Sequence, residues 1–212
     1  KARELAETMV DLGTDAGVKT VALLTNMQVP LGRTAGNALE VRESVEVLAG
    51  GGPADVVELT VRLAEEMLEA AGRGGQDVGA ALQDGRAMDA WRRMIAAQGG
   101  DPDATLPVAK ETHVVTAPTS GVLTQLDAYA VGIAAWRLGA GRARKEDPVQ
   151  AGAGVEWHAV VGDRVESGQP VMTLHTDTPE KFERALEALD GGWSIGDTAP
   201  EPTPLVLDRI AR

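Results

Sequence analysis

The sequence predicts an α/β protein, with helices concentrated in its first half and strands in its second half. Apolar side chains recur at helical spacing in several early segments, whereas runs of β-branched residues broken by Pro, Ser and Gly follow later. The residue pattern changes from helical to strand-like at residues 99–102, Gly-Gly-Asp-Pro, and this cluster is typical of a linker. We therefore expect two domains, residues 1–102 and residues 103–212.

The first predicted elements are a helix and a buried strand. Leu5, Met9 and Leu12 recur at helical spacing, and the short apolar run Val18–Leu24 follows a Gly-containing turn. The next segment, Asn26–Gly36, contains a proline and two glycines, which disfavour regular structure. We expect this segment to be a loop.

Further helices are predicted before the boundary. Asn37, followed three positions later by Glu40, resembles a capping box and starts a helix that ends near Leu48. Pro53 suits the first turn of the strongly amphipathic helix that follows. Residues 77–98 predict one short and one longer helix, separated by an Asp-Gly pair.

The second half alternates strands with two helices. Residues 113–126 contain β-branched runs around a Pro-Thr-Ser-Gly turn, which indicates a hairpin or two separate strands. A helix over Asp127–Leu138 precedes a long Gly-rich loop, and strand-like runs follow at residues 155–161 and 169–176. A last helix is predicted over Pro179–Leu189, before an extended Pro-rich tail.

Composition argues against several classes of function. The formal net charge of −12 disfavours binding to polyanions, so we expect no nucleic-acid partner. No apolar run approaches the roughly 20 residues of a membrane-spanning helix, so we expect no membrane role. The absence of cysteine excludes disulfides and fits the reducing cytoplasm. Lys1 falls inside a predicted helix with no leader before it, so we expect the chain to begin within a longer protein.

Three segments of the sequence form a recognisable set: Thr20–Leu48, Ala117–Val149 and Gly162–Thr176. Their order and spacing resemble those of the C-terminal half of bacterial-type thymidine and pyrimidine-nucleoside phosphorylases. The most specific part is PLGRTAGNALEVRESV, residues 30–45. The resemblance implies that residues 1–102 are the later part of the α/β domain of such an enzyme, and that residues 103–212 are its C-terminal domain.

The family resemblance also implies an activity. These enzymes are pentosyltransferases, a class of glycosyltransferase, and the resemblance implies phosphorolysis of thymidine to thymine and 2-deoxyribose 1-phosphate in nucleoside salvage and catabolism. Its partners would be the pyrimidine nucleoside and inorganic phosphate, with no organic cofactor, and the full-length enzyme would be a homodimer. The family's phosphate-holding and base-holding groups lie upstream of Lys1. We therefore assign no catalytic residue to this chain and leave its substrate-binding residues unknown.

A metal site is the one functional feature that the resemblance places in this chain. In the family, a monovalent cation, potassium, lies near the phosphate site. Matched position by position, its ligands are main-chain oxygens of Leu31 and Thr34 and the side chain of Glu43. Oxygen ligands suit a hard cation, and carbonyls serve whatever the side chain is. The alternative is that Glu43 is a solvated surface residue.

Two other functions are possible. APTSGVL and GDRVESGQPVMTL resemble the two halves of a biotinyl or lipoyl carrier, and on this likeness we expect a barrel-sandwich-like α/β hammerhead over the last hundred residues. A carrier needs a modifiable lysine at a hairpin tip. None of the lysines has that setting: Lys1, Lys19, Lys110, Lys145 and Lys181. The other alternative is an inactive structural fragment.

The remaining polar residues give weaker signals. His113, His158 and His175 lack the spacing of a zinc site or a catalytic triad, so we interpret them as structural or surface residues. The long Gly-rich loop contains basic residues such as Arg142 and Arg144. It is either a lid that places positive charge near phosphate or a solvated charged loop.

Overall fold

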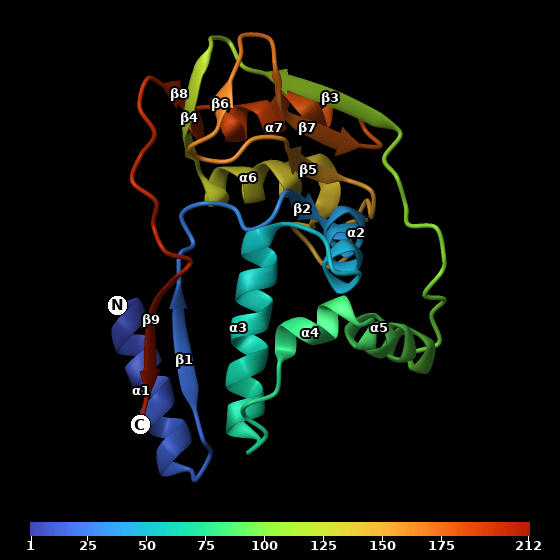
Figure 1. The fold of residues 1–212 in the computed structure, drawn as a ribbon. Coiled ribbons are helices and arrows are strands. Elements are labelled where there is room, and N and C mark those ends of the chain that lie inside the picture. The colour runs from blue at the N-terminus through green and yellow to red at the C-terminus, as the bar shows by residue number, and fades with distance from the viewer.

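The structure is a computed structural model that describes residues 1–212 (Figure 1). Its helices are α1 (Ala2–Asp15), α2 (Asn37–Leu48), α3 (Ala54–Ala70), α4 (Val78–Gln83), α5 (Arg86–Ala97), α6 (Ala128–Ala135), the π-helical turn η1 (Trp136–Ala140) and α7 (Lys181–Leu189). Its strands are β1 (Val21–Thr25), β2 (Thr34–Gly36), β3 (Glu111–Thr116), β4 (Gly121–Leu126), β5 (Gly154–Trp157), β6 (Arg164–Val165), β7 (Pro170–Thr176), β8 (Trp193–Gly196) and β9 (Val206–Ala211). The α/β class is confirmed, and every strand pair is antiparallel.

The strands form three sheets. The largest has the order β2-β5-β7-β3, a second has the order β6-β4-β8, and β1 pairs with β9 alone. A single core of 17 buried residues lies between the first two sheets and the helices α6, η1 and α7. Trp157, Leu123, Leu138 and Met172 are its largest members. Burial of this apolar surface is the main stabilisation of this part of the chain.

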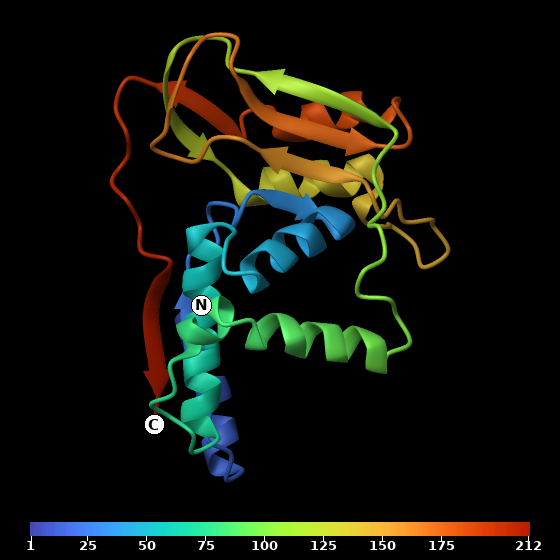
Figure 2. The same ribbon diagram turned by 45° about the vertical axis from the view of Figure 1, so that its right-hand side comes forward.

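The first half of the chain has few buried side chains. Figure 1 shows α1 beside the β1–β9 pair, and α3 with its N-terminal end near β2 and its C-terminal end far from the large sheet. Figure 2 shows α5 extending to one side of α3, below α2. Neither α3 nor α5 contains a buried residue, although both are strongly amphipathic. None of the helices combines the length and apolar character needed to cross a membrane.

Strand pairing joins the two predicted domains at two places. β2, from the first half, pairs with β5 in the large sheet, with Ala35 opposite Val155. In return β9, at the end of the chain, pairs with β1, with Ala22 opposite Ile210. The boundary at residues 99–102 falls in the irregular connection between α5 and β3. The division at this connection therefore stays a prediction, and each part includes one strand from the other half of the sequence.

Several elements differ from the sequence prediction in detail. The segment predicted to be a loop ends in β2, and the predicted extended tail ends in β9. Residues 113–126 contribute two strands to two different sheets: β3 pairs with β7, and β4 pairs with β6 and β8. The predicted helix 127–138 is α6, and it continues as the π-helical turn η1.

The start of α2 also differs from the predicted capping box. The N-cap is Gly36, whose N–H donates to Glu40 Oε1 at 2.8 Å. Asn37 does not cap the helix, because its side-chain amide donates instead to the carbonyl oxygen of Ala140 at 2.7 Å. The helix bounds, Asn37–Leu48, are those predicted.

Candidate functional site

The loop that leads into β2 turns sharply at Gly32, between α2 and α3. Gly32 has φ of +76°, in the left-handed region that favours glycine. A Cβ atom at Gly32 would lie 2.2 Å from Glu43 Oε2. Glycine is therefore needed here for its backbone conformation and for the close approach of the Glu43 carboxylate.

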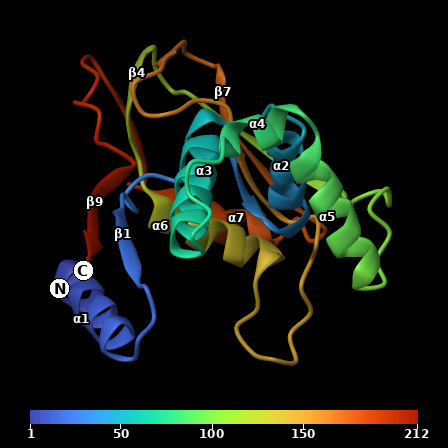
Figure 3. The same cartoon turned by 60° about the horizontal axis from the view of Figure 1, so that its bottom comes forward.

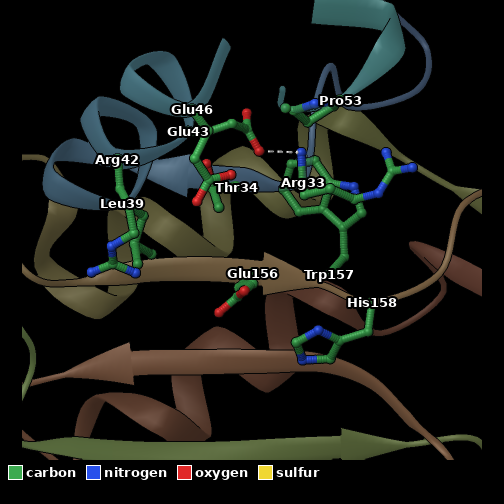
Figure 4. A pocket seen from close by; sticks show the side chains of 11 residues that line it. Arg33, Thr34, Leu39, Arg42, Glu43, Glu46, Pro53, Glu156, Trp157 and His158 are labelled. Carbon is green, nitrogen blue, oxygen red and sulfur yellow. Dashed lines mark hydrogen bonds between the residues drawn. The ribbon is translucent and has the colours of Figure 1, made fainter. Parts of the chain in front are cut away.

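Two carboxylates hold successive backbone N–H groups of this loop. The N–H of Gly32 donates to Asp55 Oδ2 at 2.9 Å. The N–H of Arg33 donates to Glu43 Oε1 at 2.7 Å, and Figure 4 shows this second bond. Asp55 lies in the first turn of α3, and Glu43 lies in the second turn of α2. Charge-assisted hydrogen bonds of this kind fix the position of the loop relative to both helices.

The loop turns one carbonyl group away from the large sheet. The N–H of Trp157 donates to the carbonyl oxygen of Arg33 at 2.9 Å, so the Arg33 carbonyl points toward β5. Main-chain groups alternate in direction along a strand, so the carbonyl of Thr34 points away from β5. β2 is an edge strand, and no other strand lies on that side. The Thr34 carbonyl is thus directed to the side of β2 that pairs with no strand.

The carboxylate of Glu43 has no partner of opposite charge within ion-pair distance. It takes part in none of the ion pairs of the structure. Burial raises its pKa, the hydrogen bond from the N–H of Arg33 opposes this effect, and the negative charge of Asp55 adds to the rise. The hydroxyl of Thr34 faces the same carboxylate, but its Oγ1 is buried without a full hydrogen bond. A bound cation would stabilise the charged form of Glu43.

Thr34 and Glu43 line a cavity of about 520 Å³ between α2 and the edge of the large sheet. Its other polar walls include Arg42, Glu156 and His158, and Figure 4 shows these side chains around the open space. No group of three or more His, Asp or Glu side chains is arranged to hold a metal ion. A cation in this cavity would therefore need carbonyl oxygens in addition to one carboxylate, a donor set that suits a hard cation.

Comparison with known proteins gives the family. Residues 122–196 match the family described as pyrimidine nucleoside phosphorylase C-terminal domain. The chain is 58% identical over 210 residues to a thymidine phosphorylase of Mycobacterium tuberculosis, which covers 99% of this chain and 49% of the relative. It is 35% identical to a human thymidine phosphorylase, over 96% of this chain and 46% of the relative. The chain belongs to the thymidine and pyrimidine-nucleoside phosphorylase family.

A pyrimidine-nucleoside phosphorylase of Staphylococcus haemolyticus is also similar, with 34% identity over 99% of this chain and 50% of the relative. The chain thus spans about half the length of the curated relatives that it matches. The family predicted from the motif PLGRTAGNALEVRESV is confirmed. The residues 122–196 of the matched C-terminal domain run from β4 to β8 and contain most of the buried core.

The structure of this phosphorylase-family chain brings two of the three predicted ligands together. Thr34 and Glu43 meet in one cavity, whereas the side chain of Leu31 is 40% exposed and lies outside the cavity lining. Cation binding by the main-chain oxygen of Leu31 therefore stays a prediction. The sequence did not indicate Asp55, which holds Gly32, or Trp157, which pairs with Arg33. The only sequence signal for Asp55 was an acidic residue in the first turn after Pro53.

His113 lies apart in the phosphorylase-family chain, whereas His158 and His175 lie near one another on neighbouring strands of the large sheet. The ring of His113 packs on Phe182 with centroids 5.6 Å apart. His158 Nε2 lies 2.8 Å from Thr173 Oγ1. His175 Nε2 lies 3.5 Å from Glu156 Oε2, and burial lowers the pKa of this histidine. His158 also lies in the wall of the candidate cavity, so the interpretation of the histidines as structural or surface residues stays a prediction.

The Gly-rich loop between η1 and β5 projects from the body of the molecule (Figure 3). It is held by its own residues, since the N–H of Arg144 donates to Asp147 Oδ2 at 2.8 Å and Arg142 Nη1 donates to the Lys145 carbonyl oxygen at 3.2 Å. Its base is fixed by Gln150, whose Oε1 accepts from the N–H of Asp177 at 2.7 Å. Whether the loop closes as a lid stays a prediction.

Proposed function

We propose that this chain forms part of a thymidine phosphorylase, which converts thymidine and inorganic phosphate to thymine and 2-deoxyribose 1-phosphate. The observation that supports the proposal most strongly is the 58% identity to a relative named thymidine phosphorylase, over 99% of this chain. In the proposed reaction, a phosphate oxygen forms a bond to the anomeric carbon while the glycosidic bond to the pyrimidine breaks. The leaving base takes up the bonding electron pair and the proton that the attacking hydrogen phosphate loses.

The contribution of this chain to that reaction is a cation site. We propose that the main-chain oxygens of Leu31 and Thr34, together with the carboxylate of Glu43, hold a potassium ion. The direction of the Thr34 carbonyl, away from β5, and the half-buried Glu43 carboxylate, which forms no ion pair, support this assignment. The ion would supply positive charge next to the bound phosphate. The Asp55 and Glu43 carboxylates position the loop that carries these oxygens.

The remaining features of the proposed enzyme follow from its family. We propose that the complete enzyme is a homodimer that works in the cytoplasm without an organic cofactor. We also propose that the two sheets around the core, β2-β5-β7-β3 and β6-β4-β8, correspond to a barrel-sandwich-like α/β hammerhead. Two sheets that pack on a common core with helices support this description.

The two alternatives are less well supported. A biotinyl or lipoyl carrier is not favoured, because the similar proteins are named as phosphorylases over nearly the whole chain. An unmodified mass spectrum of the protein purified from its natural source would exclude the carrier. If the chain is an inactive structural fragment, thymidine should stay unchanged even when the assay uses a polypeptide of the relatives' full length that contains this chain.

The test is a phosphorolysis assay on the longer polypeptide that contains this chain. We expect release of thymine and 2-deoxyribose 1-phosphate from thymidine and phosphate, and faster turnover when potassium replaces tetramethylammonium. The Glu43→Ala variant should lose most of the potassium activation, whereas Glu58→Ala, at an exposed residue of α3 outside the cavity, should keep it. No release of thymine would refute the phosphorylase, and equal potassium activation in Glu43→Ala and wild type would refute the ion site.

A further inference from the structure

β1 is paired along only one of its edges. Its partner is β9, and no strand lies on its other side. The N–H of Asn26, just after β1, donates to the Leu205 carbonyl oxygen at 2.8 Å on the β9 side. Main-chain groups alternate in direction along a strand, so the N–H of Leu24 also points to β9, and that of Leu23 points to the free edge. A free edge of this kind is a template for a further strand.

The helices α1 and α3 lie on the two faces of the β1–β9 pair. Consecutive residues of β9 contact different helices, because Asp208 forms an ion pair with Arg3 of α1 and Arg209 forms one with Glu66 of α3. Side chains alternate between the two faces of a strand, so these helices lie on opposite faces. Figures 1 and 3 both show β1 between α1 and α3. The arrangement is that of a sheet covered by helices on both faces, but with two strands only.

The sequence of β1 suits a strand inside a sheet better than a strand at an edge. Its residues Val21–Leu24 are all apolar. Continuous apolar runs are typical of strands that helices cover on both faces, whereas exposed edges are commonly protected by charged residues. Every residue of β1 is only partly buried in the structure. β1 therefore has more apolar surface than its neighbours in this chain cover.

One side of α1 lies beyond the free edge of β1. Arg3 forms an ion pair with Asp208, and Asp11 forms one with Arg212, so the side of α1 that carries Arg3 and Asp11 lies over β9. Residues at spacings of four and three share one side of a helix. The opposite side carries an apolar stripe, made of Leu5, Met9 and Leu12. These three residues are 59–66% exposed, and their stripe lies over the position next to the free edge of β1.

We propose that a strand from the rest of the longer polypeptide pairs with the free edge of β1 and buries the apolar stripe of α1. The choice of this partner rests on the proposed function, because the relatives named as phosphorylases are about twice as long as the stretch that this chain matches. The partner strand is itself apolar, since it lies under the stripe of α1. Pairing continues the β1–β9 pair into a larger sheet, which gives two isolated strands the support that they need.

The test compares amide hydrogen exchange, resolved to single residues, in the 212-residue chain and in the longer polypeptide. We expect the N–H of Leu23 to exchange about tenfold more slowly, or slower still, in the longer polypeptide, because it gains a partner. Val21 and Thr25, whose N–H groups point to the same edge, should show the same change. Leu24 is the internal control, since its N–H points to β9 and should be protected in both proteins. Equal exchange of Leu23 in the two proteins would overturn the proposal.

A substitution in the apolar stripe gives a second measurement. Met9→Glu should leave the urea midpoint of the 212-residue chain unchanged, because Met9 is 59% exposed there. In the longer polypeptide the same substitution places a charge in a buried interface and should lower the midpoint. Val108→Glu, at a residue that is 70% exposed and distant in sequence from α1, is the matched control. If Met9→Glu and Val108→Glu give the same midpoint in the longer polypeptide, the stripe is not buried and the proposal is wrong.

A second copy of this chain is the competing occupant of the edge. Protection of Leu23 in the 212-residue chain itself, rising with protein concentration, would assign the edge to that copy and overturn the proposal. Neither measurement needs turnover, so both are separable from the phosphorolysis assay. The edge can be paired in a polypeptide that releases no thymine, and an active phosphorylase in which Leu23 stays unprotected would refute the edge assignment alone.

Discussion

Glu43 Oε1 accepts a hydrogen bond from the backbone N–H of Arg33 at 2.7 Å, and this contact joins the second turn of α2 to the loop that begins β2. The same carboxylate lies close to Gly32, where only a glycine leaves room for it. Asp55 holds the neighbouring N–H from α3. Two helices therefore fix one short loop through two carboxylates, and the loop in turn presents the Thr34 carbonyl at the sheet edge.

Truncation of Glu43 should destabilise the chain. Glu43→Ala leaves the half-buried N–H of Arg33 without its acceptor, and we expect the free energy of unfolding to fall by about 1–3 kcal/mol. Urea denaturation followed by circular dichroism measures this change. Glu46→Ala is the control, because Glu46 lies on the same helix and its side chain makes no hydrogen bond or ion pair in the structure, so its stability should match the wild type. Equal loss in the two variants would contradict a specific role for Glu43.

The charge of Glu43 should make the stability depend on pH. Burial raises the pKa of Glu43 in the folded state, so the folded state binds this proton more tightly than the unfolded state. The stabilisation by this group is therefore complete below its ordinary pKa, about 4.3, and is lost as the pH rises through the raised value.

Glu43→Gln isolates this effect, since glutamine can still accept from the N–H of Arg33 but carries no charge. In buffer free of potassium, we expect the variant to gain stability relative to the wild type as the pH rises from about 4 to neutral. Parallel urea titrations at several pH values give this difference. A difference that does not change with pH would show that the Glu43 pKa is the same in both states.

The sequence predicted elements whose signals are local. The bounds of α2 followed from the Pro/Gly loop before it and the Gly cluster after it, and the break between α4 and α5 followed from Asp84-Gly85. The short strands β2, β8 and β9 were missed, because each is defined by pairing with residues distant in the sequence. A three-residue strand such as β2 carries no usable periodicity of its own.

In the candidate site, too, some residues could be predicted and others could not. Glu43 and Thr34 could be proposed only through the family resemblance of residues 30–45, and the structure places both in one cavity. Asp55 and Trp157 could not, because their contacts with the loop depend on how α3 and β5 pack against it. The use of Asn37 to hold the Ala140 carbonyl is also a tertiary contact, and it replaced the local capping bond that the sequence favours.

Gly32→Ala should lower the free energy of unfolding by more than the backbone conformation of Gly32 alone explains. An alanine there must adopt φ near +76° and must also displace the Glu43 carboxylate, whose Oε2 would be 2.2 Å from the new Cβ. Gly17→Ala is the matched control, since Gly17 has φ of +78° and nothing within 4 Å of the added atom. We expect a loss of about 1 kcal/mol for Gly17→Ala and about 2–4 kcal/mol for Gly32→Ala.

A double-mutant cycle separates the two causes of this loss. In a Glu43→Ala background, the extra cost of Gly32→Ala over Gly17→Ala should shrink, because the displaced carboxylate is gone. An unchanged extra cost would assign it to other neighbours of Gly32, such as Val56, whose Cγ2 would lie 3.0 Å from the new Cβ.

An arginine–carboxylate pair attaches β9 to α3. Arg209 Nε and Nη2 donate to the two carboxylate oxygens of Glu66 on α3 at 2.7 and 2.9 Å, and this contact lowers the pKa of Glu66. Glu66 is 12% exposed and also pairs with Arg62 at 2.8 Å. Lysine cannot make the paired contact, because it is a single point charge without the planar fork of arginine. Arg209→Lys should therefore loosen β9 from the first half of the chain.

Because this ion pair is near the surface, the change in global stability should be below about 1 kcal/mol, and local opening is the better readout. Amide hydrogen exchange should become faster in β9 and in its partner β1, and stay unchanged in β5 and β7. Arg93→Lys is the control, because Arg93 lies on α5 and forms no ion pair. If exchange in β1 is the same in Arg209→Lys and in wild type, the backbone pairing of β1 with β9 holds the strand without help from Glu66.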